Sequence, residues 1–234
     1  MHPDWLSNAY LVADRAGGTG VFVDSGAPLE PLIAAADRFD LHVTHLLTTH
    51  AHADHVANHA ELERRFGLTV LADPREDVPG AEPLGHGEIV EAGDLRIEAL
   101  RTPGHTQGML AFVVNGEICF TGDTLFAGSV GGTQDAFDDL RRSIMDVLMG
   151  LDRDMRVYPG HTDETTIGWE WDSNPFVRIW RGVDTEGEER CHVAGREAQL
   201  VLWARDYDGG GKAWVRFPDG RDAVVGGSRV ERSR

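Results

Sequence analysis

The 234-residue sequence has little of several features that would place it in a special class of protein. It contains two cysteines, Cys119 and Cys191, which are more typical of buried apolar side chains than of a disulfide in a reducing compartment. No stretch approaches the ~18 consecutive apolar residues of a transmembrane helix. The N-terminus lacks a basic segment followed by an apolar run, so no secretory signal is visible. We therefore expect a cytoplasmic protein with free thiols.

Basic residues are also scarce. The sequence has 22 lysines and arginines against 39 aspartates and glutamates, for a formal net charge of −17, and Lys212 is its only lysine. A surface this acidic disfavours nucleic acid or an anionic membrane as the main partner. We therefore expect no nucleic-acid or membrane partner, which leaves a small-molecule substrate open.

The first three quarters of the sequence alternate between strand-like and helix-like patterns. Strand patterns cover residues 8–12, 20–26, 42–50, 68–74, 94–102, 108–114, 116–122 and 155–161. Helical spacing covers residues 28–39, 56–67 and 136–151. The first two strands predict a hairpin, and the three strands over 94–122 predict an antiparallel series. Apolar strands interspersed with amphipathic helices predict sheet layers with helices outside, an α/β fold.

The character of the sequence changes after residue 182. A polar segment, VDTEGEER, leads into alternating apolar and polar residues separated by Gly-rich and Asp-Gly turns. We therefore predict a main domain over residues 1–182 and a small β-rich module over 190–234. About four strands are expected, with Trp203, Trp214 and Phe217 in its core. So small a module is marginally stable alone, so it should dock on the main domain or on a second subunit as a homodimer contact.

Ligand-type side chains gather at the ends of predicted strands. The run TTHAHADH, residues 48–55, holds three histidines and an aspartate in six consecutive positions. His105, Asp123 and His161 each lie in a Gly-containing loop beside a later strand. Such loops bend sharply and let side chains from distant strands converge. We therefore expect these residues to form one site.

The spacing within the run predicts two neighbouring metal ions. In an extended segment His50 and His52 point the same way, whereas Asp54 and His55 fall where the chain turns into a helix. Each pair leaves an ion short of ligands. His105 and His161 can each supply one nitrogen, and Asp123 can bridge both ions with its two oxygens.

Four motifs in this order resemble the metallo-β-lactamase superfamily, and within it the branch of glyoxalase II, the hydroxyacylglutathione hydrolases. They are HxHxDH at 50–55, TPGHT at 102–106, TGDTLF at 121–126 and PGHTDETTIG at 159–168. The resemblance covers about residues 6–180 and implies an αββα sandwich with metals at one edge of the sheets. By motif, it implies a first metal on His50, His52 and His105, a second on Asp54, His55 and His161, and Asp123 between them.

The resemblance also implies an activity. A metal-dependent hydrolase of this kind cleaves a thioester or related small acyl compound with a metal-bridging hydroxide, and Asp54 and Asp123 are the expected catalytic carboxylates. Asp54 is expected to orient the hydroxide. The cofactors are expected to be two divalent ions, zinc first, although a shell of nitrogen and oxygen ligands also accepts iron or manganese.

Two departures from the family pattern leave the substrate open. Gly132 stands where glutathione-handling relatives usually carry a basic residue, and a strand-rich module replaces their helical C-terminal domain. Persulfide dioxygenation by one iron on His50, His105 and Asp123 is an alternative, as is hydrolysis of a lactone or β-lactam. The module itself is interpreted as a dimerisation or lid element, with a protein-binding adaptor as the alternative.

Six further histidines match no motif and are expected on the surface or in supporting positions. They are His2, His42, His45, His59, His86 and His192.

Overall fold

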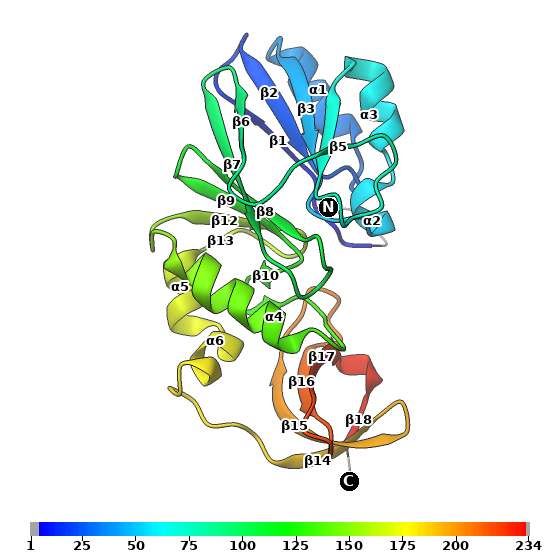
Figure 1. Ribbon diagram of the computed structural model, residues 1–234, viewed down its shortest axis with the longest axis vertical. Helices are drawn as coiled ribbons and strands as arrows, with labels where there is room; N and C mark the ends of the chain where they lie inside the picture. The colour runs from blue at the N-terminus through cyan, green and yellow to red at the C-terminus, as the bar shows by residue number, and fades with distance from the viewer. Residues whose placement is uncertain (1–4, 233–234) are drawn as a thin grey trace.

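A computed structural model describes residues 5–232 as two facing β-sheets with helices on their outer sides and a third sheet at the C-terminal end (Figure 1). The two facing sheets and their flanking helices form the αββα sandwich expected from the sequence. His2 lies outside the described residues. In residues 5–232 no helix is long and apolar enough to cross a membrane.

The first sheet has the strand order β1-β2-β3-β4-β5. Its strands are β1 (Tyr10–Ala13), β2 (Thr19–Val23), β3 (His42–Leu47), β4 (Thr69–Ala72) and β5 (Glu82–Pro83). β1 and β2 form the predicted antiparallel hairpin, and β2 to β5 are parallel. Helices α1 (Glu30–Arg38) and α3 (His59–Phe66) cover its outer face, where Ala36 and Leu62 pack against Phe22 and Leu46.

The second sheet has the strand order β13-β12-β9-β8-β7-β6. Its strands are β6 (Ile89–Ala92), β7 (Leu95–Arg101), β8 (Leu110–Val114), β9 (Ile118–Gly122), β12 (Arg156–Pro159) and β13 (Thr165–Thr166). The predicted antiparallel series is confirmed as β7-β8-β9. Because β12 is parallel to β9, strands β7, β9 and β12 all run in one direction. Their carboxyl ends therefore meet at one edge of the sheet.

Apolar side chains from both sheets fill the space between them. Val21 and Leu47 of the first sheet pack in one cluster with Ile97, Phe112 and Phe120 of the second. All five residues of β8, LAFVV, are buried, which explains their unbroken apolar sequence: this strand is covered on both faces.

The helices on the outer face of the second sheet differ from the helix predicted there. The helix predicted over 136–151 is only partly correct, because α4 (Phe137–Arg142) passes into a π-helical turn (Ser143–Val147) and a 3₁₀ turn (Leu148–Gly150). Within this break Ser143 Oγ donates to the carbonyl of Pro103 at 2.6 Å, which ties the helix to the loop that carries His105. Helices α5 (Ile167–Ser173) and α6 (Pro175–Trp180) complete the layer.

The predicted strand over 42–50 and helix over 56–67 also have different limits. β3 ends at Leu47, and helical structure already begins at α2 (Ala53–Val56) before α3. Gly67 ends α3 in the left-handed conformation, which glycine adopts without strain. The last residues of the TTHAHADH run therefore lie in a loop and a short helix.

The C-terminal sheet has five strands rather than four, in the order β17-β16-β15-β14-β18. The strands are β14 (Glu189–Val193), β15 (Arg196–Ala204), β16 (Lys212–Arg216), β17 (Asp222–Gly226) and β18 (Val230–Arg232), with β10 (Leu125–Phe126) and β11 (Ser129–Val130) forming a separate small hairpin. One face forms its own core around Val215 and Phe217. The other face contributes Trp214 and Val224 to the cluster beneath the second sheet.

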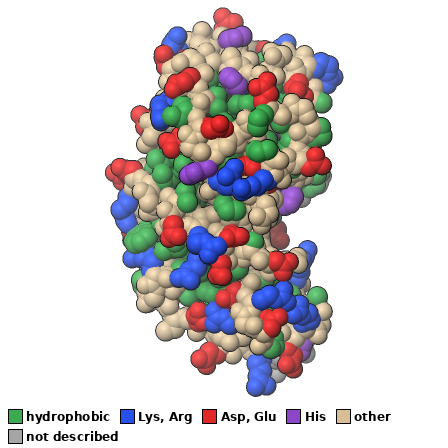
Figure 2. All heavy atoms as spheres, in the orientation of Figure 1, with side chains coloured by type: hydrophobic (Ala, Val, Ile, Leu, Met, Phe, Trp, Pro, Cys, Tyr) green, Lys and Arg blue, Asp and Glu red, His purple; other side chains and the backbone are tan. Residues whose placement is uncertain are grey.

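Two of the three core residues predicted for this module are buried. Trp214 and Phe217 are buried, but Trp203 is 39% exposed. Its ring lies near the end of β15, beneath the Arg232 guanidinium, rather than inside either cluster. Cys119 and Cys191 are buried free thiols, as expected. On the face shown in Figure 2, acidic and basic side chains are interspersed.

Candidate metal centre

The predicted ligands lie just after the ends of strands and meet at one edge of the sheets. His50 and His52 follow β3, His105 follows β7, Asp123 comes directly after β9, and His161 comes just after β12. Because β7, β9 and β12 run in one direction, the loops after them open at the same edge of the sheet. The structure brings all seven predicted ligands together there.

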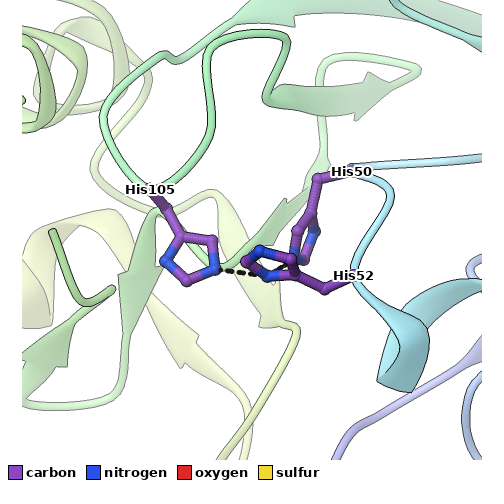
Figure 3. Close-up of side chains that lie close together, drawn as sticks. All are labelled: His50, His52 and His105. Atoms are coloured by element: carbon purple, nitrogen blue, oxygen red, sulfur yellow. Dashed lines mark hydrogen bonds between the residues drawn. The ribbon is translucent and has the colours of Figure 1, made fainter. Parts of the chain in front are cut away.

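The first group is His50, His52 and His105, whose rings point toward one another (Figure 3). His52 Nδ1 lies 3.0 Å from His50 Nε2 and 2.9 Å from His105 Nε2. Nitrogens bound to one ion at ~2.0–2.1 Å lie about 3 Å apart, so this spacing is that of a shared metal. These three residues could hold one ion.

The second group is Asp54, His55 and His161, with Asp123 beside it. Asp54 Oδ2 lies 3.6 Å from His55 Nε2 and 3.5 Å from His161 Nε2. Asp123 Oδ2 lies 3.4 Å from His161 Nε2 and 3.5 Å from His105 Nε2, while its Oδ1 lies 3.4 Å from His55 Nε2. The Asp123 carboxylate therefore lies between the two groups.

Hydrogen bonds on the far side of two rings determine which nitrogen carries a lone pair. His105 Nδ1 donates to the carbonyl of Gly132 at 2.8 Å, and His161 Nδ1 donates to the carbonyl of Leu6 at 2.9 Å. A carbonyl only accepts, so both Nδ1 atoms are protonated and a neutral ring directs its Nε2 lone pair into the site. Lone pairs that converge in this way repel one another unless a cation lies between them.

Asp24 accepts a hydrogen bond from His55 Nδ1 and so orients this ring, although it was not among the predicted site residues. Its Oδ2 accepts from His55 Nδ1 and from Thr49 Oγ1, both at 2.8 Å, and its Oδ1 accepts from the Thr49 amide at 2.8 Å. Asp24 is 2% exposed. A carboxylate behind a histidine is the usual outer partner of a metal ligand. In the sequence, its position at the end of an apolar strand before Ser25 and Gly26 is the only indication.

Two buried atoms of the site have no hydrogen-bond partner within the described part of the chain. They are His55 Nε2 and Asp123 Oδ1, which lie 3.4 Å apart. Leaving buried polar atoms unpaired costs about 1–3 kcal/mol each. A divalent cation would satisfy both, so the donor set fits a metal centre of nitrogen and oxygen ligands.

Burial and the neighbouring carboxylates shift the pKa values of the site's histidines in opposite directions when no metal is bound. Burial lowers the pKa of His50 well below its usual value. Burial also opposes protonation of His55, but Asp123 and Asp24 outweigh it and raise the His55 pKa well above the usual value. Burial is likewise outweighed at His161, where Asp123 and Asp54 raise the pKa to about 9. A metal bound to the second group must therefore displace protons.

Glycines let the loops approach closely enough for this geometry. A Cβ on Gly160 would lie 2.3 Å from Asp123 Oδ1 and 2.8 Å from His55 Cε1. A Cβ on Gly26 would lie 1.5 Å from the carbonyl oxygen of Asp54. Any larger residue at either position would push ligands apart.

The other described histidines lie outside the two groups. His42 and His86 are exposed, and His45 and His192 are partly buried. His59 is 9% exposed, lies 3.5 Å from Thr48 Oγ1, and burial lowers its pKa to about 4. His59 is thus buried close behind the ligand run rather than on the surface.

The C-terminal sheet reaches the site through the loop between β15 and β16. Tyr207 in this loop stacks on His161, with ring centroids 4.0 Å apart and an interplanar angle of 8°. A cavity of about 830 Å³ lies between this loop and His52 and His105. Tyr207 was not among the predicted site residues, because no local pattern in the sequence relates it to His161.

Comparisons with known proteins agree with this geometry. A model of the metallo-β-lactamase superfamily matches residues 2–161. The chain is 35% identical over 236 aligned residues to a hydroxyacylglutathione hydrolase of Rhodopseudomonas palustris, which covers 95% of this chain and 92% of the relative. This relative therefore also spans the C-terminal sheet.

Two solved structures support the same assignment. ETHE1 from Myxococcus xanthus superposes with a TM-score of 0.66 at 31% identity, covering 74% of this chain and 80% of the other. TTHA1623 in a di-iron-bound form superposes with a TM-score of 0.62 at 31% identity, covering 75% of this chain and 97% of the other. The chain belongs to the metallo-β-lactamase superfamily, and its fold is the metallo-β-lactamase fold with extra C-terminal strands. Its homologues include proteins named hydroxyacylglutathione hydrolase.

Proposed function

We propose that the protein is a dinuclear metal-dependent hydrolase that cleaves a thioester. The observation that carries this proposal is the position of Asp123, whose Oδ2 is within 3.5 Å of both His105 Nε2 and His161 Nε2. One carboxylate reaching ligands of both groups favours two ions over one. The di-iron form of TTHA1623 and the hydroxyacylglutathione hydrolase of Rhodopseudomonas palustris support the number of metals and the substrate class.

Each ion has its own ligand set in this proposal. His50, His52 and His105 would hold the first, Asp54, His55 and His161 would hold the second, and Asp123 lies within reach of both groups. We propose zinc as the native metal, with iron or manganese compatible with the same donors. When bound, two such ions would lower the pKa of a water molecule and polarise the carbonyl of the substrate.

Asp54 supplies the base on the protein side. Burial opposes its ionisation, but His161 and His55 outweigh burial and keep the pKa of Asp54 below its usual value. The side chain is 27% exposed, so solvent reaches the carboxylate. An ionised carboxylate there accepts a hydrogen bond from the attacking water and orients it. The thiolate of a thioester leaves without a strong general acid.

Metal analysis together with a substrate panel tests the proposal. The purified protein should contain about two metal equivalents and hydrolyse thioesters faster than it hydrolyses a lactone or a β-lactam. Asp123→Ala should lose both metal and turnover, because one side chain serves both groups. An Asp123→Ala variant that retains two metals and full activity would overturn the bridging assignment.

A second candidate is persulfide dioxygenation by a single iron. It is favoured by the similarity to ETHE1 of Myxococcus xanthus and by the proximity of His105 to Asp123, two of the three ligands that a single iron would need. One iron equivalent per chain, with oxygen consumed in the presence of a persulfide and no thioester hydrolysis, would replace the first proposal by this one.

A further inference from the structure

The cavity beside the metal centre has two walls of different origin. The main fold contributes His52, His105 and the segment around Gln134, and the C-terminal sheet contributes Tyr207, Lys212 and Arg229. At about 830 Å³ the cavity has room for a small acyl-thiol compound. A molecule in it would contact both parts of the chain at once.

Aromatic packing fixes the loop of the C-terminal sheet against the metal centre. Tyr207 stacks on His161 at 4.0 Å and meets the Phe126 ring edge-on at 5.8 Å. His161 is 1% exposed, and its Nδ1 is held by Leu6. The Tyr207 ring thus covers one face of a proposed ligand and forms the wall of the cavity next to it.

A buried ion pair holds the same loop from behind. Lys212 Nζ lies 2.9 Å from Asp206 Oδ2, and the two side chains are 8% and 2% exposed. The ammonium group also lies 5.4 Å from the Tyr207 ring centroid and 5.6 Å from that of Phe126. Because these two charges neutralise each other, the pair shapes the cavity without presenting a free charge to it.

A backbone contact joins β17 to the segment that orients His105. The amides and carbonyls of Thr133 and Val224 exchange two hydrogen bonds of 2.9 and 2.8 Å. The preceding residue, Gly132, accepts from His105 Nδ1. The C-terminal sheet is therefore docked in a defined register beside the first metal group.

Arg229 presents a cation to this cavity that forms no ion pair with a carboxylate of residues 5–232. It is exposed and lies in the turn between β17 and β18. The lining carboxylate Asp135 is already paired with Arg221 at 3.1 Å, and Asp208 Oδ1 accepts from the Gly210 amide at 2.7 Å within its own loop. An unpaired guanidinium beside a catalytic cavity suits a carboxylate, which it can bind through two hydrogen bonds.

We infer that the C-terminal sheet completes the substrate site of this enzyme. Tyr207 positions the substrate beside the metal centre, and Arg229 binds a carboxylate on the thiol part of the acyl-thiol substrate. This inference rests on the proposed hydrolase function for the identity of the substrate. It makes the module a source of specificity rather than a separate adaptor.

Two thioesters with one acyl group and different thiols test Arg229. One thiol is 3-mercaptopropionate, which carries a carboxylate, and the other is N-acetylcysteamine, which is uncharged. Arg229→Gln should raise KM for the anionic thioester about tenfold with kcat unchanged, and should leave the neutral thioester within twofold. Arg190→Gln is the matched control, because Arg190 is an exposed arginine of the same sheet outside this cavity. Equal losses on both thioesters, or none, would overturn the role of Arg229.

Tyr207 is tested by rescue with a conservative variant. Tyr207→Phe keeps the ring over His161 and should retain kcat/KM within twofold for both thioesters. Tyr207→Ala removes the wall and should lower kcat/KM at least fivefold for both. Wild-type kcat/KM in Tyr207→Ala would overturn the positioning role.

Binding without turnover separates this inference from the proposed function. S-methyl-3-mercaptopropionate is a thioether that cannot be hydrolysed, and its binding to the metal-loaded protein can be measured by calorimetry. If no thioester is hydrolysed, but this thioether binds wild type and Arg190→Gln at least tenfold more tightly than Arg229→Gln, the proposed function fails and the anion site stands. If the thioether does not bind wild type, the anion site fails whatever the turnover.

Discussion

Replacing Asp24 by Asn should weaken metal binding although Asp24 is not itself among the proposed ligands. The carboxylate is 2% exposed and accepts three hydrogen bonds of 2.8 Å, from the Thr49 amide, Thr49 Oγ1 and His55 Nδ1. An Asn side chain has the same shape but only one oxygen. If its oxygen keeps the hydrogen bond from the Thr49 amide, its amide nitrogen faces His55 Nδ1 and favours the His55 tautomer whose Nε2 carries hydrogen. That tautomer cannot bind a metal.

The expected size of the effect follows from the bond that is lost. A hydrogen bond to a charged group contributes about 1.5–3 kcal/mol, and outer partners of metal ligands typically change affinity by about 10–100-fold. We therefore expect Asp24→Asn to bind the metal of the second group at least tenfold more weakly. The first group should change less, because Asp24 reaches it only indirectly, through Thr49 Oγ1, which donates to Asp24 and lies 3.0 Å from His50 Nδ1.

Competition with a chromophoric chelator measures both affinities in one titration. Asp73→Asn is the matched control, because Asp73 is 1% exposed and paired with Arg101 without touching either metal group. This control should lose thermal stability but keep wild-type metal affinity. If Asp24→Asn and Asp73→Asn both bind two metals as wild type does, the argument that Asp24 controls the lone pair of His55 is refuted.

Three further changes should have distinct outcomes. Deleting the residues after Gly182 should give insoluble or molten protein, because Trp214 packs in the cluster beneath the second sheet. A soluble fragment that unfolds cooperatively and has wild-type metal content would contradict this. Metal-free His59→Leu should lose less stability than wild type in urea titrations between pH 6.5 and 4. Burial lowers the pKa of His59 in the folded chain to about 4, whereas the pKa of an unfolded histidine is about 6.5. The neutral side chain therefore contributes up to about 3 kcal/mol of stability above pH 6.5, and this contribution is lost as the pH falls toward 4. Equal losses of stability in wild type and His59→Leu would contradict this role of His59. Gly160→Ala should lower metal content, since the new Cβ would lie 2.3 Å from Asp123 Oδ1, whereas Gly150→Ala, with nothing within 4 Å, should not; equal metal content in the two would show that the site can relax.

Local patterns determined the layers of the fold. The alternation of apolar strands with amphipathic helices predicted the sheets and most of their flanking helices. The spacing of apolar residues within a short segment is enough to indicate which face of a strand or helix is buried. The limits of elements were less predictable. The helix predicted over 136–151 is interrupted where Ser143 bonds to Pro103, a contact 40 residues away in the sequence. Trp203 was assigned to a core from its apolar character, although its place near the end of β15 leaves it partly exposed.

The sequence by itself determined the ligand types and their order, because metal-binding residues occur in short motifs at the ends of strands. Only the tertiary structure decided what stands behind and beside them. Asp24 reaches His55 across 31 residues, and Tyr207 reaches His161 from a different sheet. Such partners are chosen by the packing of whole layers against one another, so no local spacing records them. The proposed metal ligands could therefore be predicted from the sequence. The residues that select the tautomers of the histidines and shape the substrate cavity could not.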